Sequence, residues 1–385
     1  MTAQLEERTR KRLAELEAAG LRRRLVPPRG VDLSSNDYLG LAEHPLLKQR
    51  MAEAVREEGC GSTASRLLRG ERARLSALER RFADFKGTPA ALYFSSGYQA
   101  NLGVLATFLE PGDLVFSDEL NHASLIDGIR LGRARCVVFP HRGVSALRRL
   151  LAKESSSGQV YIVTESLFSM DGDFAPLAEY AELCRETGAA LIADEAHAVG
   201  IYGEAGSGLI EQTGCGGNVF LSVNPAGKAL GVSGAFAAGP SWAIDFLIQK
   251  ARTLIFSTAA PPAIAAALDA ALDIVAAEPE RRAMLLRRAN ALRRRLHDGG
   301  LSVEPEGSQI IPVVVGGNDD AVALAEFFSD QGFDVRAIRP PTVPAGSARL
   351  RISVNVKASD ADLERFADQL CAACAKISPI IAASS

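Results

Sequence analysis

The chain has 385 residues, of which 47% are hydrophobic and 23% are charged, and its formal net charge is -3. This length predicts one large domain and a smaller one. The nearly balanced charge argues against nucleic acid or an anionic membrane as a partner. The sequence contains no run of about 20 apolar residues of the kind that spans a membrane, so we expect a cytoplasmic protein.

The six cysteines are scattered in a way that does not indicate a disulfide framework. Cys371 and Cys374 form a lone CxxC in an alanine-rich stretch with helical spacing. Because no second CxxC and no nearby histidine accompany them, packing is favoured over zinc or redox chemistry. We therefore expect no metal site.

Residues 1–20 have the leucine spacing of an amphipathic helix, which Gly20 is expected to end. From about residue 45, helical stretches such as 75–85 alternate with short apolar runs. The runs typical of strands are 90–94, 114–116, 136–139, 160–163 and 190–193. This alternation predicts a mostly parallel sheet that is covered by helices on both faces. Ligands of such sheets bind beyond the carboxyl ends of the strands. The candidate site residues are therefore those that follow the runs: 95–99, 117–122, 165–173 and 194–197.

A helical stretch over residues 265–300 leads into a segment with a different pattern. Strands are expected there at 310–315 and 350–354, and helices at 321–328 and 360–370. We expect three parts: an N-terminal helix and arm (1–44), a large domain (45–275) and a small C-terminal α+β domain (276–385).

Lys228 lies in a segment of small, apolar and glycine residues, 224–236. Lysine normally faces water, and burial would lower its pKa and make the neutral amine available as a nucleophile. On this segment alone, a surface lysine on a glycine-rich loop is an equal alternative.

Asp194 follows an expected strand and is therefore placed at the candidate site. Alone it could be a metal ligand, a helix N-cap or a member of a catalytic triad. A more specific use pairs it with Lys228, about thirty residues further on. The lysine would form a Schiff base with pyridoxal phosphate, and the aspartate would keep the pyridine nitrogen protonated.

Pyridoxal phosphate would also need a site for its phosphate group and a side chain in contact with its ring. The segment 95–101 follows an expected strand and opens a helix, where glycine and hydroxyl residues bind phosphate through free backbone N–H groups. This motif is weak by itself. His122 follows another apolar run and could stack on the cofactor ring, although a histidine satisfied in the core is equally compatible.

Six segments now stand in one order along the chain: 36–42, 95–101, 121–124, 164–173, 194–197 and the segment around Lys228. Together they resemble the α-oxoamine synthases, a family of fold-type I pyridoxal-phosphate enzymes, over residues 20–370. The resemblance implies an α/β fold whose large domain has a mostly parallel seven-stranded sheet sandwiched by helices, with a smaller α+β C-terminal domain. It also implies pyridoxal 5'-phosphate as cofactor and a homodimer with shared active sites.

Residues 21–24 and 338–351 are similar to the branch of this family that serves biotin biosynthesis. The resemblance implies an acyltransferase that condenses L-alanine with a pimeloyl thioester, carried by coenzyme A or acyl carrier protein. The products would be 8-amino-7-oxononanoate, carbon dioxide and free thiol. Glycine C-acetyltransferase, 5-aminolevulinate synthase and serine palmitoyltransferase share the cofactor apparatus and stay open as alternatives. A non-catalytic subunit is disfavoured by the presence of Lys228 and Asp194, and a serine hydrolase by the lack of a GxSxG turn after a strand.

The resemblance also implies roles for individual residues. Lys228 would hold the cofactor and act as acid and base at the alanine Cα, and Asp194 would pair with the pyridine nitrogen. His197 would bond the phenolic oxygen of the ring, and His122 would stack over the ring and face the substrate. The other implied cofactor contacts are Gly97, Tyr98 and Ser169, with Ser257 and Thr258 reaching the phosphate of the neighbouring subunit.

For the substrate, the resemblance implies Arg351 as the clamp for the amino-acid carboxylate, since a guanidinium makes two-point contacts with carboxylates. Arg22 would bind the distal pimelate carboxylate, and Thr342 would lie in a substrate-facing loop. One position departs from the family, which usually has a hydroxyl residue three positions before the lysine, where this chain has Pro225. Proline has no side-chain donor and no N–H. We therefore expect weaker or differently shaped phosphate binding, with a cost of about 1.5–3 kcal/mol if nothing replaces the lost hydrogen bond.

Overall fold

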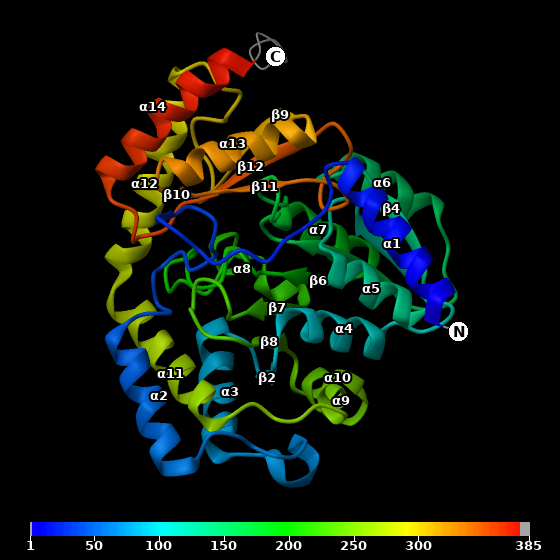
Figure 1. Cartoon of the computed structure of the whole chain (residues 1–385). Coiled ribbons are helices and arrows are strands. Elements are labelled where there is room, and N and C mark those ends of the chain that lie inside the picture. The colour runs from blue at the N-terminus through cyan, green and yellow to red at the C-terminus, as the bar shows by residue number, and fades with distance from the viewer. Residues whose placement is uncertain (1, 378–385) are drawn as a thin grey trace. The chain divides into compact units, whose positions relative to one another are not determined.

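The computed structural model describes residues 2–377 and divides the chain into two compact units (Figure 1). The larger unit comprises residues 36–169 and 173–283, and the smaller one comprises, of the described residues, 2–35, 170–172 and 284–377. Helix α12 (Pro279–Asp298) passes from the larger into the smaller unit. Within the described residues, no helix combines the length and the apolar character that crossing a membrane requires.

The larger unit contains a seven-stranded sheet with the order β2-β8-β7-β6-β5-β3-β4. Its strands are β2 (Ala90–Phe94), β3 (Leu114–Asp118), β4 (Arg135–Phe139), β5 (Val160–Glu165), β6 (Ala190–Asp194), β7 (Val219–Pro225) and β8 (Ala235–Gly239). Neighbouring strands from β4 to β7 run parallel, whereas β8 is antiparallel to both β7 and β2. The expectation of a mostly parallel seven-stranded sheet is confirmed, and the five expected strands form within one to two residues of their predicted bounds.

Every residue of β3 and of β8 is buried, including those on alternate faces, so helices cover both faces of this sheet. The helices of this unit are α2 (Pro45–Glu58), α3 (Ala73–Lys86), α4 (Gly97–Phe108), α5 (Ala123–Gly132), α6 (Val144–Lys153), α7 (Leu177–Thr187), α8 (Leu209–Gln212), α9 (Ser241–Lys250), α10 (Arg252–Ile255) and α11 (Pro262–Ala277), with short turns of helix at η1 (Arg66–Gly70) and η2 (Gly216–Asn218). The order in which strands are added switches at β3, because β4 lies on one side of β3 and the next strand, β5, lies on the other. Ligand sites of α/β sheets form at such a switch point.

The long helical stretch expected over residues 265–300 is two helices, so that prediction was wrong in its continuity. α11 ends at Ala277 and α12 begins at Pro279. The residue before a proline is pushed out of the helical region, and Glu278 has φ -121° and ψ 59°. Pro279 then serves as the first residue of α12, where its missing N–H costs nothing.

The smaller unit contains a three-stranded antiparallel sheet with the order β11-β12-β9 and a two-stranded parallel pair, β1-β10. Its elements are α1 (Thr2–Ala18), β1 (Val31–Asp32), β9 (Ile310–Gly316), α13 (Asn318–Asp330), β10 (Phe333–Asp334), β11 (Arg336–Ile338), β12 (Ala348–Ser353) and α14 (Asp360–Ile377). The pairing of β1 with β10 fixes the N-terminal arm to this unit. Gly20 follows α1 with φ +63°, as its expected role as helix stop requires.

Candidate active site

Asp194 is the last residue of β6 and is 4% exposed. Its Oδ2 accepts a hydrogen bond from Asn101 Nδ2 at 2.7 Å, and its Oδ1 accepts one from the Ala196 N–H at 2.8 Å. Asn101 also donates to Ser124 Oγ at 2.9 Å, which joins α4 to the start of α5. The aspartate is thus fixed from two elements at the carboxyl end of the sheet.

His197 is buried and lies three residues beyond Asp194. Its Nδ1 is 2.6 Å from the hydroxyl oxygen of Tyr38, which in turn donates to Asn36 Oδ1 at 2.9 Å. A ring nitrogen bound in this way fixes the orientation of the imidazole. Tyr38 was not singled out by the sequence, although it stands inside the 36–42 segment that carries the family resemblance.

Lys228 lies in the loop between β7 and β8 and is half-buried. The loop is closed by hydrogen bonds from the Ala226 N–H to the Gly234 carbonyl (2.8 Å) and from the Gly231 N–H to the Lys228 carbonyl (2.9 Å). This arrangement presents the lysine from a short, tied loop. Partial burial agrees with the sheltered environment that its sequence neighbours predict.

His122 caps the start of α5, and its Nδ1 is 2.7 Å from Ser124 Oγ. The His122 side chain is exposed at the surface, but the protein around it still removes part of its hydration, and this desolvation lowers its pKa. The negative charge of Asp194 opposes this effect, and the positive charge of Lys228 adds to it. Asp194, at the end of β6, and Lys228 are thus both near enough to His122 for their charges to influence its pKa. A neutral imidazole with an open face suits stacking on a planar ring.

The expected phosphate end is the start of α4. Ser96 is its N-cap and accepts from the Gln99 N–H at 3.2 Å, while Gly97 and Tyr98 form the first turn. A Cβ added to Gly97 would meet Pro225 Cγ at 2.7 Å, so only glycine fits here. Pro225 therefore packs directly against this helix start. Tyr98 is 44% exposed, and its hydroxyl contacts Asp127.

Ser169 lies in the loop that follows β5, and an ion cluster around His141 braces this loop. His141 Nδ1 is 2.9 Å from Asp118 Oδ1, its Nε2 is 2.9 Å from Asp173 Oδ2, and its ring contacts Phe168 edge-on at 4.3 Å between centroids. Two carboxylate partners require both ring nitrogens to donate. Although burial alone would lower it, the hydrogen bonds to the two aspartates raise the pKa of His141 to about 9.

This raised pKa predicts a loss of stability at alkaline pH. In the unfolded chain the pKa of histidine is about 6.5, so His141 stabilises the fold fully below that pH and loses its contribution as pH rises through about 9. We expect the wild type to exceed His141→Gln in unfolding free energy by about 2 kcal/mol at pH 6.5 and by much less at pH 9.5. Denaturant titrations at both pH values measure this. His297→Gln, in which the lost contact is to the Val303 carbonyl (3.0 Å), is the control. A difference that does not shrink with pH would contradict the prediction.

Several buried polar atoms near Asp194 lack a hydrogen-bond partner, which bears on whether these residues fit a bound polar group. Within the described residues, such atoms include Glu165 Oε1, Ser166 Oγ, Asn101 Oδ1 and Asn224 Oδ1. All four belong to residues at the ends of β5 and β7 or beside Asp194. Since buried polar atoms are normally paired, their concentration here fits a site built for a polar ligand such as pyridoxal phosphate.

The remaining predicted residues divide between the units. Ser257 and Thr258 follow α10 in the larger unit, where Thr258 is exposed. Arg351 lies in β12 of the smaller unit, is 7% exposed and donates to Ser353 Oγ at 2.7 Å.

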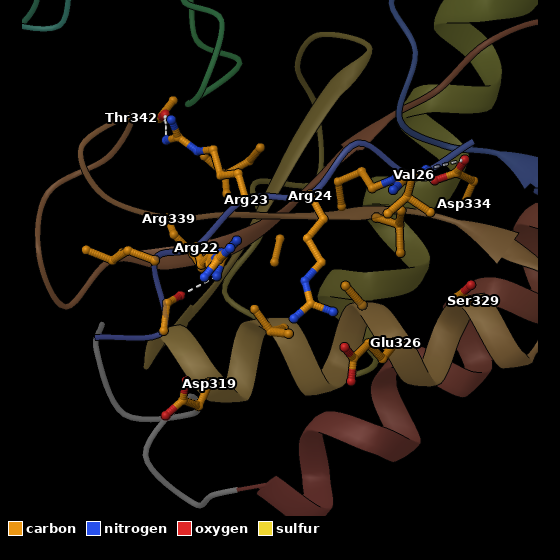
Figure 2. Close-up of a pocket in the computed structure, with 18 of the residues that line it drawn as sticks. Arg22, Arg23, Arg24, Val26, Asp319, Glu326, Ser329, Asp334, Arg339 and Thr342 are labelled. Atoms are coloured by element: carbon orange, nitrogen blue, oxygen red, sulfur yellow. Dashed lines mark hydrogen bonds and ion pairs between the residues drawn. The ribbon is translucent and has the colours of Figure 1, made fainter. Parts of the chain in front are cut away.

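The smaller unit also brings Arg22 and Thr342 to one cavity of about 810 Å³. Figure 2 shows three consecutive arginines leaving the N-terminal arm in different directions. Arg22 pairs with Glu17 at 3.3 Å, whereas the residue that donates to the Thr342 hydroxyl, at 3.4 Å, is Arg23. The sequence identified the basic run but not which guanidinium meets Thr342.

The chain matches the family model "Aminotransferase class I and II" over residues 28–370. It is 47% identical over 336 residues to the 8-amino-7-oxononanoate synthase of Geobacter sulfurreducens, covering 86% of each chain. A solved 8-amino-7-oxononanoate synthase from Francisella tularensis superposes with TM-score 0.77 at 28% identity, covering 90% of this chain and 98% of that one. A serine palmitoyltransferase from S. paucimobilis with a bound PLP-myriocin aldimine has TM-score 0.89 at 27% identity, covering 96% and 97%. Backbone similarity thus does not separate the sister enzymes, whereas sequence identity favours one.

Proposed function

Because the chain belongs to the class I and II aminotransferases and, within them, to the 8-amino-7-oxononanoate synthases, we propose that it condenses L-alanine with a pimeloyl thioester. The products are 8-amino-7-oxononanoate, carbon dioxide and the free thiol of coenzyme A or acyl carrier protein. The observation that carries the proposal is that Asp194 ends β6 and Lys228 follows β7, the neighbouring parallel strand, while the charges of both act on His122. The 47% identity to a named synthase supports the same reaction.

Pyridoxal phosphate, when bound, supplies an electron sink that stabilises negative charge at the substrate Cα. Lys228 is the proposed attachment point, and its Nζ takes the Cα proton of alanine. Asp194, fixed by Asn101 and Ala196, would hold the proton on the pyridine nitrogen of the bound cofactor, and His197 would hydrogen-bond its ring oxygen. Gly97 and Tyr98 offer the N–H groups of a helix start to the phosphate.

The substrate residues then act in sequence. Arg351 would hold the alanine carboxylate and so fix the direction of the Cα–H bond from which Lys228 takes the proton. The deprotonated Cα attacks the thioester carbonyl, a C–C bond forms, and the thiolate leaves. The resulting β-keto acid loses its carboxylate as carbon dioxide, and Lys228 returns a proton to the carbon.

The distal carboxylate of the pimeloyl group is proposed to bind the cavity that Arg22, Arg23 and Thr342 line. We expect Arg23→Ala to raise the KM for the thioester at least about tenfold, since a bond to a charged group contributes about 1.5–3 kcal/mol. Arg22→Ala should cost no more, because Arg23 is already ordered by Thr342 whereas Arg22 must leave Glu17. The KM for alanine should stay unchanged. Initial-rate measurements check this, with Arg12→Ala on exposed α1 as control; an unchanged thioester KM for Arg23→Ala would refute it.

A homodimer is proposed from the surface around Ser257 and Thr258. Phe256 is 71% exposed and Leu68 is 82% exposed, and their loops are joined by the Ala259 N–H donating to the Ala64 carbonyl at 2.9 Å. Exposed large apolar side chains on adjoining segments are typical of an interface. Ser257 and Thr258 would then reach the partner's phosphate site, and sedimentation at micromolar concentration would detect the dimer.

The proposed reaction is tested with a matrix of amino acids and thioesters. Alanine, glycine and serine are each combined with pimeloyl-, acetyl-, succinyl- and palmitoyl-CoA, and thiol and carbon dioxide release are measured. Alanine with the pimeloyl thioester should have the highest kcat/KM. A higher value for glycine with acetyl-CoA or succinyl-CoA, or for serine with palmitoyl-CoA, would assign the chain to a sister activity.

A further inference from the structure

Tyr38 is a buried tyrosine beside His197 to which the proposed chemistry assigns no task. It is 0% exposed, and its ring meets the imidazole of His197 edge-on, with 6.0 Å between centroids. The turn that carries it is closed by two hydrogen bonds, from the Tyr38 N–H to the Asn36 carbonyl (2.8 Å) and from the Gly40 N–H to the Asp37 carbonyl (2.9 Å). The phenol group is thus presented to His197 from a tied turn.

The Tyr38 hydroxyl group has one proton and two polar neighbours. Asn36 Oδ1, at 2.9 Å, is a carbonyl oxygen that can only accept, so the hydroxyl proton goes to it. His197 Nδ1, at 2.6 Å, therefore meets a lone pair of the phenol oxygen. A contact this short between an oxygen lone pair and a ring nitrogen is a hydrogen bond only if the nitrogen carries a proton. The two contacts together thus require a proton on Nδ1 of His197.

The proton on Nδ1 decides what the other ring nitrogen of His197 can do. In a neutral imidazole with Nδ1 protonated, Nε2 is a hydrogen-bond acceptor. His197 is 3% exposed, and a neutral ring avoids the cost of a buried charge. Because Nδ1 is bonded to Tyr38, a contact of His197 with the ring oxygen of bound pyridoxal phosphate would go through Nε2. An accepting Nε2 would favour that oxygen in its protonated form.

We propose that Tyr38 is a positioning residue that acts through His197. Together with Asn36 it keeps the neutral imidazole in the tautomer that is protonated on Nδ1, so that Nε2 meets the cofactor as an acceptor. This role needs no contact between Tyr38 and the cofactor. The tautomer is a property of the cofactor-free chain, whereas its effect on the ring oxygen rests on the proposed function.

Nuclear magnetic resonance of cofactor-free protein with ¹⁵N-labelled histidines measures the tautomer, because protonated and unprotonated ring nitrogens differ in chemical shift. His197→Gln identifies the His197 signals among those of the five histidines. Tyr38→Phe removes the phenol oxygen, and Asn36→Leu removes the acceptor and releases the Tyr38 proton for Nδ1. Tyr180→Phe is the matched control, because Tyr180 is also 0% exposed but its hydroxyl group has no hydrogen-bond partner within the described residues.

In the wild type and in Tyr180→Phe, we expect the tautomer protonated on Nδ1 to exceed the other at least about tenfold, because a buried hydrogen bond supports it. The ratio should fall to about one or below in Tyr38→Phe, and it should invert in Asn36→Leu, where the phenol can donate to Nδ1. A wild-type His197 protonated on Nε2, alone or on both nitrogens, would overturn the proposal. An unchanged ratio in either variant would overturn it as well.

The effect on the cofactor is measured from the absorbance of the loaded enzyme at one fixed pH. Tyr38→Phe allows Nε2 to donate, which favours a deprotonated ring oxygen, so absorbance should move from the shorter-wavelength to the longer-wavelength band. Tyr180→Phe should match the wild type. Equal spectra despite a changed tautomer ratio would overturn the proposed effect on the cofactor. Failure of the wild type to bind pyridoxal phosphate would instead refute the proposed function, and the tautomer ratios would still decide the role of Tyr38.

Discussion

Lys228→Ala is expected to lower the rate of thiol release by roughly 10⁴-fold or more, the scale of loss seen when a group that makes and breaks bonds is removed. The same variant should bind pyridoxal phosphate without the long-wavelength absorbance of a covalently attached cofactor. The reason is that one amine carries two tasks, attachment and proton transfer. Its short loop between β7 and β8 holds it near enough to His122 for its charge to lower the pKa of that histidine.

Rescue by an added amine separates the proton-transfer task from the attachment task. A small primary amine added to Lys228→Ala should restore part of the rate, because it can occupy the space of the side chain and accept a proton. Lys153→Ala, on the exposed end of α6, should behave as the wild type. Retention of full activity and of the absorbance by Lys228→Ala would remove the lysine from the mechanism and the chain from this chemistry.

The strand ends could be predicted from the sequence because a parallel sheet has a simple rule: short apolar runs that alternate with helices place the residues after them at one edge. Asp194, His197 and His122 follow from that rule, and the order of the motifs identified Lys228. The break at Pro279 was also readable, since proline and its predecessor resist helix continuation. It was missed because the apolar spacing resumes directly after it.

The partners of charged groups were not predictable in the same way. Periodicity indicates which face a residue occupies, not which distant group it meets. His141 joins Asp118 to Asp173 through contacts that span 23 and 32 residues and leave no local pattern. Arg23 meets Thr342 across 319 residues. The conformation of the N-terminal arm, not the arginine run itself, decides that pairing.

Glu195, the residue that follows Asp194, belongs to a buried ion pair that is expected to matter for stability. Glu195 and Lys86 form an ion pair in which the side chains are 0% and 2% exposed. Lys86 also donates to the Ser207 carbonyl, and Glu195 Oε1 accepts from the Ile210 N–H at 3.0 Å. The pair therefore ties the end of α3 to the segment between β6 and α8 that contains His197.

Lys86→Met is expected to lower the unfolding free energy by about 3–5 kcal/mol, because it leaves the Glu195 carboxylate buried without its cation. Adding Glu195→Gln should recover a large part of this loss, since glutamine carries no charge and can still accept from Ile210. The matched control is the exposed pair Arg185–Glu182, whose side chains are 61% and 46% exposed; Arg185→Met should cost less than about 1 kcal/mol.

Urea unfolding of the cofactor-free variants measures these differences without interference from cofactor binding. If Lys86→Met lost no more than the surface control, the pair would be solvated and not buried. If the double variant were no more stable than Lys86→Met, the damage would come from lost packing of the lysine stem and not from an uncompensated charge. The expected outcome, a large loss that neutralising Glu195 reverses, would show that the Asp194–His197 segment depends on a charge 109 residues earlier in the chain. Destabilising this pair should therefore also weaken cofactor binding, through Asp194 and His197, although neither Lys86 nor Glu195 is proposed to touch the cofactor.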